Sequence, residues 1–294
     1  MVRVSLGGMV EMGKIKVSEL FYSLQGEGRY QGVPSIFLRT FGCNLTCSGF
    51  GMPKGMLSEE RNNINPKNYT DYKSLPLVST GCDSYASWDP RFKHLSPVVD
   101  TSDLADRIVS LLPYNDWQGV HLVITGGEPL LGWQREYPSL LDDHRMKKLK
   151  EITFETNGTH CLTDDFKHYL KNIWTKSGTA KNREVTFSVS PKLSCSGENE
   201  NDTLKPDVIL DYQETGHTYL KFVVATQDDV NEALYFTDVY RRTGFTGEVY
   251  LMPVGGVDSV YSLNNKNVAE LAMKYGLRFS DRLQVVLWKN QWGT

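Results

Sequence analysis

The chain has 294 residues, 40% of them apolar and 23% charged, and its 32 basic and 35 acidic side chains leave a net charge of −3. This composition suits a globular protein with a full core, and the near-neutral charge argues against a dedicated nucleic-acid surface. No apolar run approaches the ~20 residues of a membrane-spanning helix, and Met1–Gly13 has no apolar secretory stretch. We therefore expect a cytoplasmic protein, and the odd number of five cysteines excludes a secreted disulfide scaffold.

Short runs of β-branched and aromatic residues predict strands, and apolar residues at helical spacing between several of them predict helices. Strands that alternate with helices favour one mostly parallel sheet, whose ligands gather at the carboxyl ends of the strands. In chain order we expect a strand over Ser35–Thr40, a helix over Asp103–Leu112, strands over His121–Thr125 and Glu151–Thr156, a helix over Asp164–Ile173, strands over Val185–Val189, Tyr219–Val224 and Glu248–Met252, a helix over Asn267–Tyr275 and a last strand over Leu283–Leu287.

Two polar stretches interrupt this alternation. Residues 48–81 contain four asparagines and three prolines, and residues 194–205 read SCSGENENDTLK. Long connections on a protein surface cost little free energy, so we interpret both stretches as surface insertions. Residues 1–294 are then expected to form a single domain that carries these two insertions.

Three cysteines are candidates for an inorganic centre. Cys43 and Cys47 lie four residues apart directly after the first predicted strand, and Cys82 follows the first insertion. Three thiolates on a four-iron cluster would leave one iron open to a substrate or cofactor. Buried free cysteines or a zinc site, with His94 or Cys161 as a fourth ligand, are the alternatives. The remaining cysteines are interpreted as ordinary small apolar side chains.

Polar or glycine-rich turns follow three consecutive predicted strands. They are Thr125–Pro129 (TGGEP), Glu155–Gly158 (ETNG) and Ser190–Lys192 (SPK). Paired glycines permit the backbone to approach a ligand closely, and Glu128 stands where it could accept a hydrogen bond from a ligand ammonium group. Taken singly, each turn is also typical of a simple strand end. Together they predict one shared pocket, because the carboxyl ends of parallel strands meet at one edge of a sheet.

The sequence resembles the radical S-adenosylmethionine (SAM) superfamily. The residues that carry this resemblance are Cys43-x3-Cys47, Cys82, Gly126–Pro129 and Ser190–Lys192. Within it the sequence is similar to the 7-carboxy-7-deazaguanine synthase family, over nearly the whole chain apart from the two insertions. The matching runs are Phe21–Gly28 (FYSLQGEG), Phe37–Leu45 (FLRTFGCNL), Cys82–Ser84 (CDS), the GGEP, ETNG and SPK turns, Leu251–Val254 and Leu283–Lys289.

The resemblance implies an incomplete TIM-like α/β barrel of the radical SAM type with mostly parallel strands. It also implies a lyase that converts 6-carboxy-5,6,7,8-tetrahydropterin to 7-carboxy-7-deazaguanine with loss of ammonia, in queuosine and 7-deazapurine biosynthesis. SAM on the open iron of a [4Fe–4S] cluster would supply the radical that abstracts a substrate hydrogen, while the protein orients the reactants. A homodimer and a flavodoxin-like electron donor are implied as well.

The resemblance assigns residues to each ligand. Cys43, Cys47 and Cys82 would hold the cluster, and Ser84, where the family usually has Thr, would offer an oxygen to Mg²⁺. Glu27 and Arg39 are the catalytic candidates: Glu27 would accept paired N–H donors from an aminopyrimidine edge, and Arg39 would hold the substrate carboxylate. The substrate positions are Leu24, Gln25, Gly26, Glu27, Arg39, Thr125 and Thr294. The SAM positions are Gly127, Glu128, Ser190, Pro191, Lys192, Met252, Pro253, Val254 and Gly255.

The sequence departs from the family at a few points. The 34 residues between Cys47 and Cys82 far exceed the short spacing usual in the superfamily, and Trp288 stands where the family often has His. A glycyl-radical activating enzyme would share the cluster and the SAM turns but act on a protein, and the pattern of Gln25–Gly28 with Arg39 argues against it. A non-catalytic zinc- or cluster-binding module would leave the three turns without a purpose.

Overall fold

The computed structural model describes residues 13–179 and 182–294. Residues 1–12, on which part of the expectation for Met1–Gly13 rests, lie outside the described residues. Within the described ranges nine strands form one sheet, in the order β3-β1-β2-β4-β5-β6-β7-β8-β9. Their bounds are β1 Lys14–Leu24, β2 Pro34–Thr40, β3 Val98–Asp100, β4 His121–Gly126, β5 Glu151–Thr156, β6 Glu184–Val189, β7 His217–Val224, β8 Val249–Pro253 and β9 Arg278–Phe279.

The sheet is mostly parallel and open. Strands β2 and β4 to β9 pair in parallel, whereas β1 pairs antiparallel with β2 and with β3. The edge strands β3 and β9 do not meet, so the barrel is incomplete. The expected fold class, a partial α/β barrel with mostly parallel strands, is confirmed.

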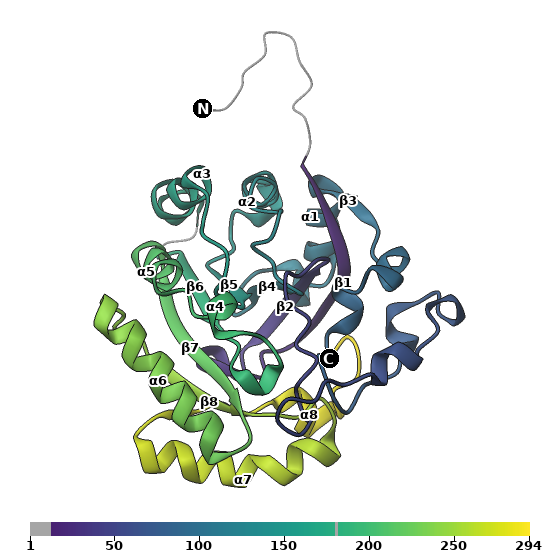
Figure 1. Ribbon diagram of the computed structural model, residues 1–294. Coiled ribbons are helices and arrows are strands. Elements are labelled where there is room, and N and C mark those ends of the chain that lie inside the picture. The colour runs from purple at the N-terminus through teal and green to yellow at the C-terminus, as the bar shows by residue number, and fades with distance from the viewer. Residues whose placement is uncertain (1–12, 180–181) are drawn as a thin grey trace.

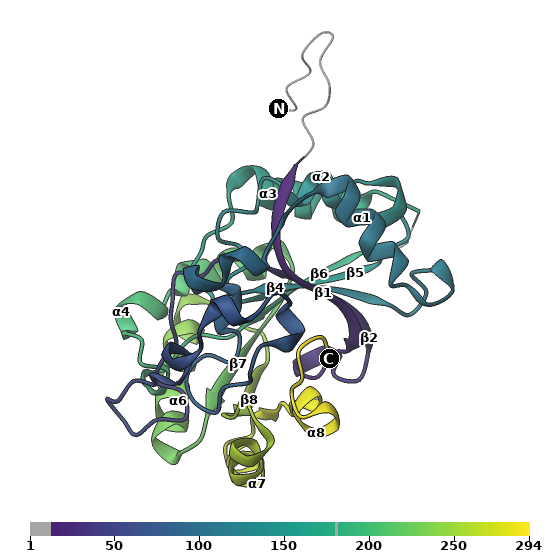
Figure 2. The same ribbon diagram turned by 90° about the vertical axis from the view of Figure 1, so that its right-hand side faces the viewer.

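Six of the described helices, α1 to α3 and α5 to α7, cover the outer face of the curved sheet. Figure 1 shows α1, α2 and α3 over one end of the sheet and α5, α6 and α7 over the other, and Figure 2 shows the same separation for all of these except α5, which it does not label. Among the described helices, none is long and apolar enough to cross a membrane. Their bounds are α1 Thr101–Ser110, α2 Tyr137–Leu141, α3 Asp164–His168, α4 Glu200–Thr203, α5 Pro206–Thr215, α6 Gln227–Thr243, α7 Asp258–Tyr275 and α8 Leu283–Trp288.

The main core lies between this outer layer and the sheet. All six residues of β4 are buried, as expected for a central parallel strand that is covered on both faces. Phe154 of β5 and Phe187 of β6 stack at 5.7 Å, and Tyr212 of α5 stacks on Phe187 at 4.6 Å. This packing holds the strands in register, so that their carboxyl ends lie at a common edge.

The sequence predictions for the elements are confirmed except at the C-terminal end. Each predicted strand from Ser35 to Met252 overlaps a strand of the sheet, and the three predicted helices overlap α1, α3 and α7. The strand predicted over Leu283–Leu287 is wrong, because this segment forms the helix α8. A short apolar run is compatible with either structure, and only Val285 of α8 is buried. Strand β1 and helices α5 and α6 were not predicted.

The two polar stretches are folded segments that contact each other. Residues 48–81 contain short 3-10 turns and place Tyr72, Leu75 and Val78 in a small apolar cluster against Trp292. The second stretch carries α4, and its Ser196 carbonyl accepts a hydrogen bond of 2.8 Å from the Gly49 amide. That residues 1–294 form a single domain with two insertions stays a prediction.

Candidate active site

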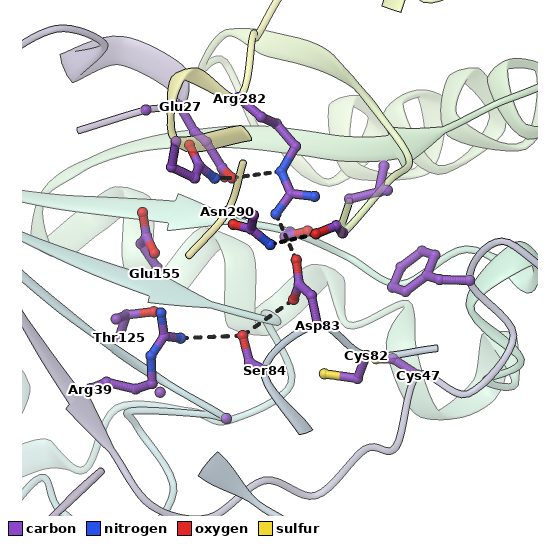
Figure 3. Close-up of a pocket in the computed structure, with 18 of the residues that line it drawn as sticks. Glu27, Arg39, Cys47, Cys82, Asp83, Ser84, Thr125, Glu155, Arg282 and Asn290 are labelled. Carbon is purple, nitrogen blue, oxygen red and sulfur yellow. Dashed lines mark hydrogen bonds and ion pairs between the residues drawn. The ribbon is translucent and has the colours of Figure 1, made fainter. Parts of the chain in front are cut away.

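A cavity of about 250 Å³ opens at the carboxyl ends of the parallel strands. Strands β2, β4, β5 and β7 contribute Arg39, Thr125, Glu155 and Lys221 to its lining, and Figure 3 shows several of these side chains around it. Most residues predicted for the site meet here: Leu24, Gln25, Gly26, Glu27, Arg39, Cys43, Cys47, Cys82, Ser84, Thr125, Gly127, Ser190, Lys192, Met252, Val254, Gly255 and Thr294 all line the cavity. Glu128, Pro191 and Pro253 do not line it.

All three candidate cysteine ligands line this cavity. All five cysteines of the chain are free thiols, and Cys161 is exposed rather than a buried apolar side chain. The Leu45 amide donates to Cys43 Sγ at 3.4 Å, and the Trp88 indole donates to Cys82 Sγ at 3.3 Å. Burial raises the pKa of Cys43 to about 12 and raises the pKa values of Cys47 and Cys82 as well.

The cysteines are not arranged around a single ion. Across residues 13–179 and 182–294, no three His, Cys, Asp or Glu side chains come close enough together to hold one metal ion. A four-iron cluster is wider than one ion, and each of its cysteine ligands binds a different iron. Three thiols that line one cavity but form no site for a single ion fit such a cluster.

The paired glycines after β4 give room to the cysteine loop. A Cβ atom on Gly127 would lie 2.5 Å from the Gly42 carbonyl oxygen and 2.7 Å from Cys43 Cβ. A Cβ atom on Gly126 would lie 2.5 Å from the Thr40 carbonyl oxygen. Backbone atoms cannot yield at such distances, so glycine is required at both positions. The sequence predicted a close approach of a ligand to this turn. In the structure it is the loop carrying Cys43 that lies against Gly127.

Glu128 is buried behind that turn. Its carboxylate accepts hydrogen bonds from the amides of Asn157 at 2.7 Å and Leu130 at 3.0 Å, and from Thr156 Oγ1 at 2.8 Å. Burial raises the pKa of Glu128 to about 6, although these hydrogen bonds oppose the rise. In this structure the side chain therefore joins the turns after β4 and β5, and its predicted contact with a SAM ammonium group stays a prediction.

The turn after β6 places a positive charge beside the cysteines. Lys192 Nζ donates to Ser190 Oγ at 2.9 Å, and both residues line the cavity. The charge of Lys192 acts to lower the pKa of each of the three cavity cysteines, against the larger effect of burial. A cation at this place favours an anionic ligand in the adjoining part of the cavity.

The Glu27 carboxylate lies among three donors from the C-terminal half of the chain. Lys221 donates to Oε2, while Gln284 Nε2 at 2.7 Å and Arg282 Nε at 3.2 Å donate to Oε1. Burial by itself would raise the pKa of Glu27, but the charges of Lys221 and Arg282 lower it to about 2. Glu27 is therefore an anion, and an aminopyrimidine edge would share its oxygens with these donors.

A chain of polar contacts runs from Arg282 to Arg39 (Figure 3). Arg282 Nη2 donates to Asp83 Oδ2 at 2.6 Å, and Ser84 Oγ donates to Asp83 Oδ1 at 3.2 Å. Arg39 Nη1 donates to Ser84 Oγ at 3.2 Å, and Arg39 Nε donates to Glu19 Oε2 at 2.9 Å. The two predicted catalytic residues thus belong to one network, and the predicted Mg²⁺ ligand Ser84 lies between a carboxylate and a guanidinium group.

Several polar residues of this network were missed by the sequence reasoning. Asp83 and Glu155 lie inside recognised motifs, and Gln25 Nε2 donates to Glu155 Oε1 at 3.0 Å. Lys221 carried a usable signal, because a lysine inside the apolar run Tyr219–Val224 is rarely buried without a partner. Two further site residues gave no such signal: Arg282, which directly precedes the segment predicted as a strand, and Gln284 within that segment.

The C-terminal segment closes one side of the cavity. The Trp292 ring packs edge-on against Tyr72 at 4.9 Å, and its indole donates to the Leu75 carbonyl at 2.9 Å. This contact fixes the last residues against the first insertion, where Thr294 lines the cavity. Trp288 instead lies in a separate shallow pocket together with Tyr22.

Comparison with solved structures supports the class of fold. The crystal structure of QueE from Escherichia coli aligns with a TM-score of 0.53 and 20% sequence identity, over 91% of this chain and 93% of that one. The likeness shows the class of fold: an open, mostly parallel α/β sheet is common to the two chains. No model of a protein family matches the sequence.

Comparison with curated proteins shows the family. The 7-carboxy-7-deazaguanine synthase of Halobacterium salinarum is 32% identical over 288 residues, 94% of this chain and 91% of the relative. Proteins of the same name from Pyrobaculum aerophilum and Rhodopirellula baltica are 26% and 27% identical, over 95% of this chain and 97% and 88% of their own lengths.

The chain belongs to the 7-carboxy-7-deazaguanine synthase family. The enzyme class predicted from the sequence, a radical SAM lyase of queuosine biosynthesis, is confirmed. Membership in this family sets aside the glycyl-radical activating enzyme and the non-catalytic zinc module as alternatives.

Proposed function

We propose that this protein converts 6-carboxy-5,6,7,8-tetrahydropterin to 7-carboxy-7-deazaguanine with loss of ammonia. One observation carries the proposal: Cys43, Cys47 and Cys82 line the same cavity as the charged network of Glu27 and Arg39. A radical enzyme needs its cluster and its substrate within one closed space, because a reactive intermediate must be kept from water.

The residues around the cavity fit a [4Fe–4S] cluster with one open iron. Cys43, Cys47 and Cys82 would hold it, and N–H donors of Leu45 and Trp88 already lie against two of the sulfurs. Bound SAM supplies the radical chemistry there. The SAM positions are proposed to be Gly127, Glu128, Ser190, Pro191, Lys192, Met252, Pro253, Val254 and Gly255, of which Lys192 offers a cation for the SAM carboxylate.

The charged network is proposed to bind the pterin. Arg39 presents a guanidinium group that pairs with a carboxylate in two parallel hydrogen bonds, which suits the 6-carboxylate of the substrate. Glu27 is an anion and accepts N–H donors from the aminopyrimidine edge. Mg²⁺ takes oxygen ligands, and Ser84 Oγ next to the Asp83 carboxylate supplies two of them at the cavity wall. Leu24, Gln25, Gly26, Thr125 and Thr294 complete the substrate positions.

Three further features belong to this proposal by family resemblance. The protein is proposed to act as a homodimer, to receive electrons from a small flavodoxin-like donor and to reside in the cytoplasm. The homodimer is tested by the molar mass of the purified protein in solution.

The function is tested by anaerobic reconstitution with iron and sulfide, followed by turnover with SAM, a reductant and the carboxypterin. We expect about four irons per chain and formation of 7-carboxy-7-deazaguanine. Cys82→Ala should lose SAM cleavage, whereas the matched control Cys161→Ala, which replaces an exposed cysteine, should keep it. One tightly held zinc in place of the cluster, or SAM cleavage without product, would refute the proposal.

A further inference from the structure

We infer that Glu198 and Glu60, one glutamate from each insertion, are positioning residues that hold the loops of Cys47 and Cys82 in place for the cluster. This inference rests on the proposed function, because the cluster itself belongs to that proposal. Neither glutamate lines the cavity, and the sequence reasoning assigned a role to neither. Both insertions thereby acquire a function in the site.

Glu198 of the second insertion accepts hydrogen bonds from the backbone of the loop that carries Cys43 and Cys47. Its Oε1 accepts hydrogen bonds from the Cys47 amide at 2.7 Å, the Thr46 amide at 2.8 Å and Thr46 Oγ1 at 3.1 Å. Cys47 has a φ angle of 48°, which lies in the left-handed region that residues other than glycine rarely adopt. Such a conformation persists only where the surroundings enforce it, and Glu198 bonds the amide of that very residue.

Glu60 of the first insertion makes an equivalent set of contacts beside Cys82. Its carboxylate accepts hydrogen bonds from the amides of Ser79 and Thr80, both at 2.9 Å, and from their hydroxyl groups at 2.8 and 3.0 Å. Burial opposes ionisation of Glu60, but these donors outweigh it and hold the pKa of the carboxyl below its ordinary value. The segment that leads into Cys82 is therefore bound to a charged acceptor.

The first insertion also closes on itself next to the cysteines. The Gly81 amide donates to the Phe50 carbonyl at 2.7 Å, so the residue before Cys82 is bonded to a residue three positions after Cys47. The two insertions touch at glycines, since a Cβ atom on Gly49 would lie 2.5 Å from the Gly197 nitrogen. This close contact brings the loop of Glu198 against the chain that follows Cys47.

These contacts compensate for the conformational freedom that the long insertion gives to Cys82. In a short cysteine motif the chain itself keeps the third thiol near the other two, whereas 34 intervening residues leave it free and add loop-closure entropy. Hydrogen bonds to a charged acceptor are about twice as strong as neutral ones, and they offset that entropy at two points. Hydrogen bonds to the Glu198 and Glu60 carboxylates thus hold the two cysteine loops in place, as a short connection between the cysteines does in other motifs.

Glu198 is also expected to affect the reduction potential of the cluster. Its carboxylate accepts the hydrogen bond of the Cys47 amide, so a negative charge lies beside one of the proposed cluster ligands. Net charge and hydrogen bonds to the sulfurs set the reduction potential of such clusters. Glu198→Gln removes the charge and keeps the size, so the potential of the reconstituted cluster should rise, an effect that a purely structural role would not produce.

The inference is tested first without the cluster, by hydrogen exchange of backbone amides in the metal-free protein. We expect Glu198→Ala to speed exchange at Thr46 and Cys47, and Glu60→Ala to speed it at Ser79 and Thr80, by about tenfold or more. Exposed acidic neighbours supply the matched controls, Asp202→Ala and Glu59→Ala, which should exchange like the parent protein.

The reconstituted protein supplies the second measurement. Both glutamate variants should lose iron to a chelator about tenfold faster than the parent and the two controls, at unchanged circular dichroism. Parent-like exchange at the four amides, or parent-like iron loss, would overturn the inference. A parent that takes up no cluster would refute the proposed function instead, and the exchange experiment would still decide whether the glutamates hold these loops.

Discussion

The buried pair of Lys221 and Glu27 offers the sharpest test of the electrostatics of the site. The side chains are 5% and 13% exposed, and their contact joins β7 to the loop that follows β1. The perturbation is a double-mutant cycle with Lys221→Met, Glu27→Gln and the combined variant. Methionine matches the length of the lysine stem, so the cycle removes the charges with little change in packing.

The magnitude follows from the pKa of Glu27. That pKa, about 2, lies well below the ordinary value of 4.5, which corresponds to roughly 3 kcal/mol of stability at neutral pH. Lys221 exerts the largest of the attractive effects and Arg282 the next. We therefore expect a coupling energy between Lys221 and Glu27 of about 2 kcal/mol. The single variant Lys221→Met reports less, since it also removes the cost of burying an ammonium group.

The assay is urea denaturation of the four proteins, from which the coupling energy is obtained as the non-additive part. A depressed carboxyl pKa contributes stability above pH 4.5 that is lost as the pH falls toward about 2. The coupling energy should therefore shrink over that range. The exposed pair of Lys266 and Glu270, 87% and 59% exposed, is the control and should show almost no coupling. Equal coupling energies in the two cycles would refute the reasoning.

Three further predictions concern single residues of the site. Cys82→Ala should abolish SAM cleavage at unchanged circular dichroism, and a fully active variant would remove Cys82 from the ligand set. Glu27→Ala should impair pterin turnover more than uncoupled SAM cleavage; an equal loss of both rates would show that Glu27 is only structural. Burial raises the pKa of Glu128 to about 6, so the folded protein binds the proton more tightly than the unfolded chain. The free energy of unfolding should then fall by roughly 2 kcal/mol as the pH rises from about 4.5 through 6, and Glu128→Gln should abolish this slope. A pH profile shared by the parent and Glu128→Gln would contradict that assignment.

The strands and the motifs at their ends were predictable because their signals are local. The apolar, β-branched run of β4 favours a buried strand, and the glycines that follow it mark a close approach of backbone. Parallel strands bring their carboxyl ends to one edge whatever the side chains between them. For this reason the TGGEP, ETNG and SPK turns could be expected at one edge, and residues of all three line one cavity.

The segment Leu283–Leu287 shows where local signals end. Its residues Leu-Gln-Val-Val-Leu suit a strand, yet the Leu283 amide bonds to the Gly26 carbonyl at 3.1 Å and the segment continues as the helix α8. A short apolar run takes the structure that its surroundings impose. Those surroundings include β9, which is only two residues long, and the loop of Glu27.

The family motifs, the strands and the edge at which the cavity lies could be read from the sequence alone, since each of these signals is carried by residues close together along the chain. Only the tertiary structure decided which charges meet. Glu27 and Arg282 stand 255 positions apart, and no pattern along the chain records their contact or the capture of the Cys47 amide by Glu198. Burial makes such contacts strong, and burial is a property of the folded chain rather than of any segment.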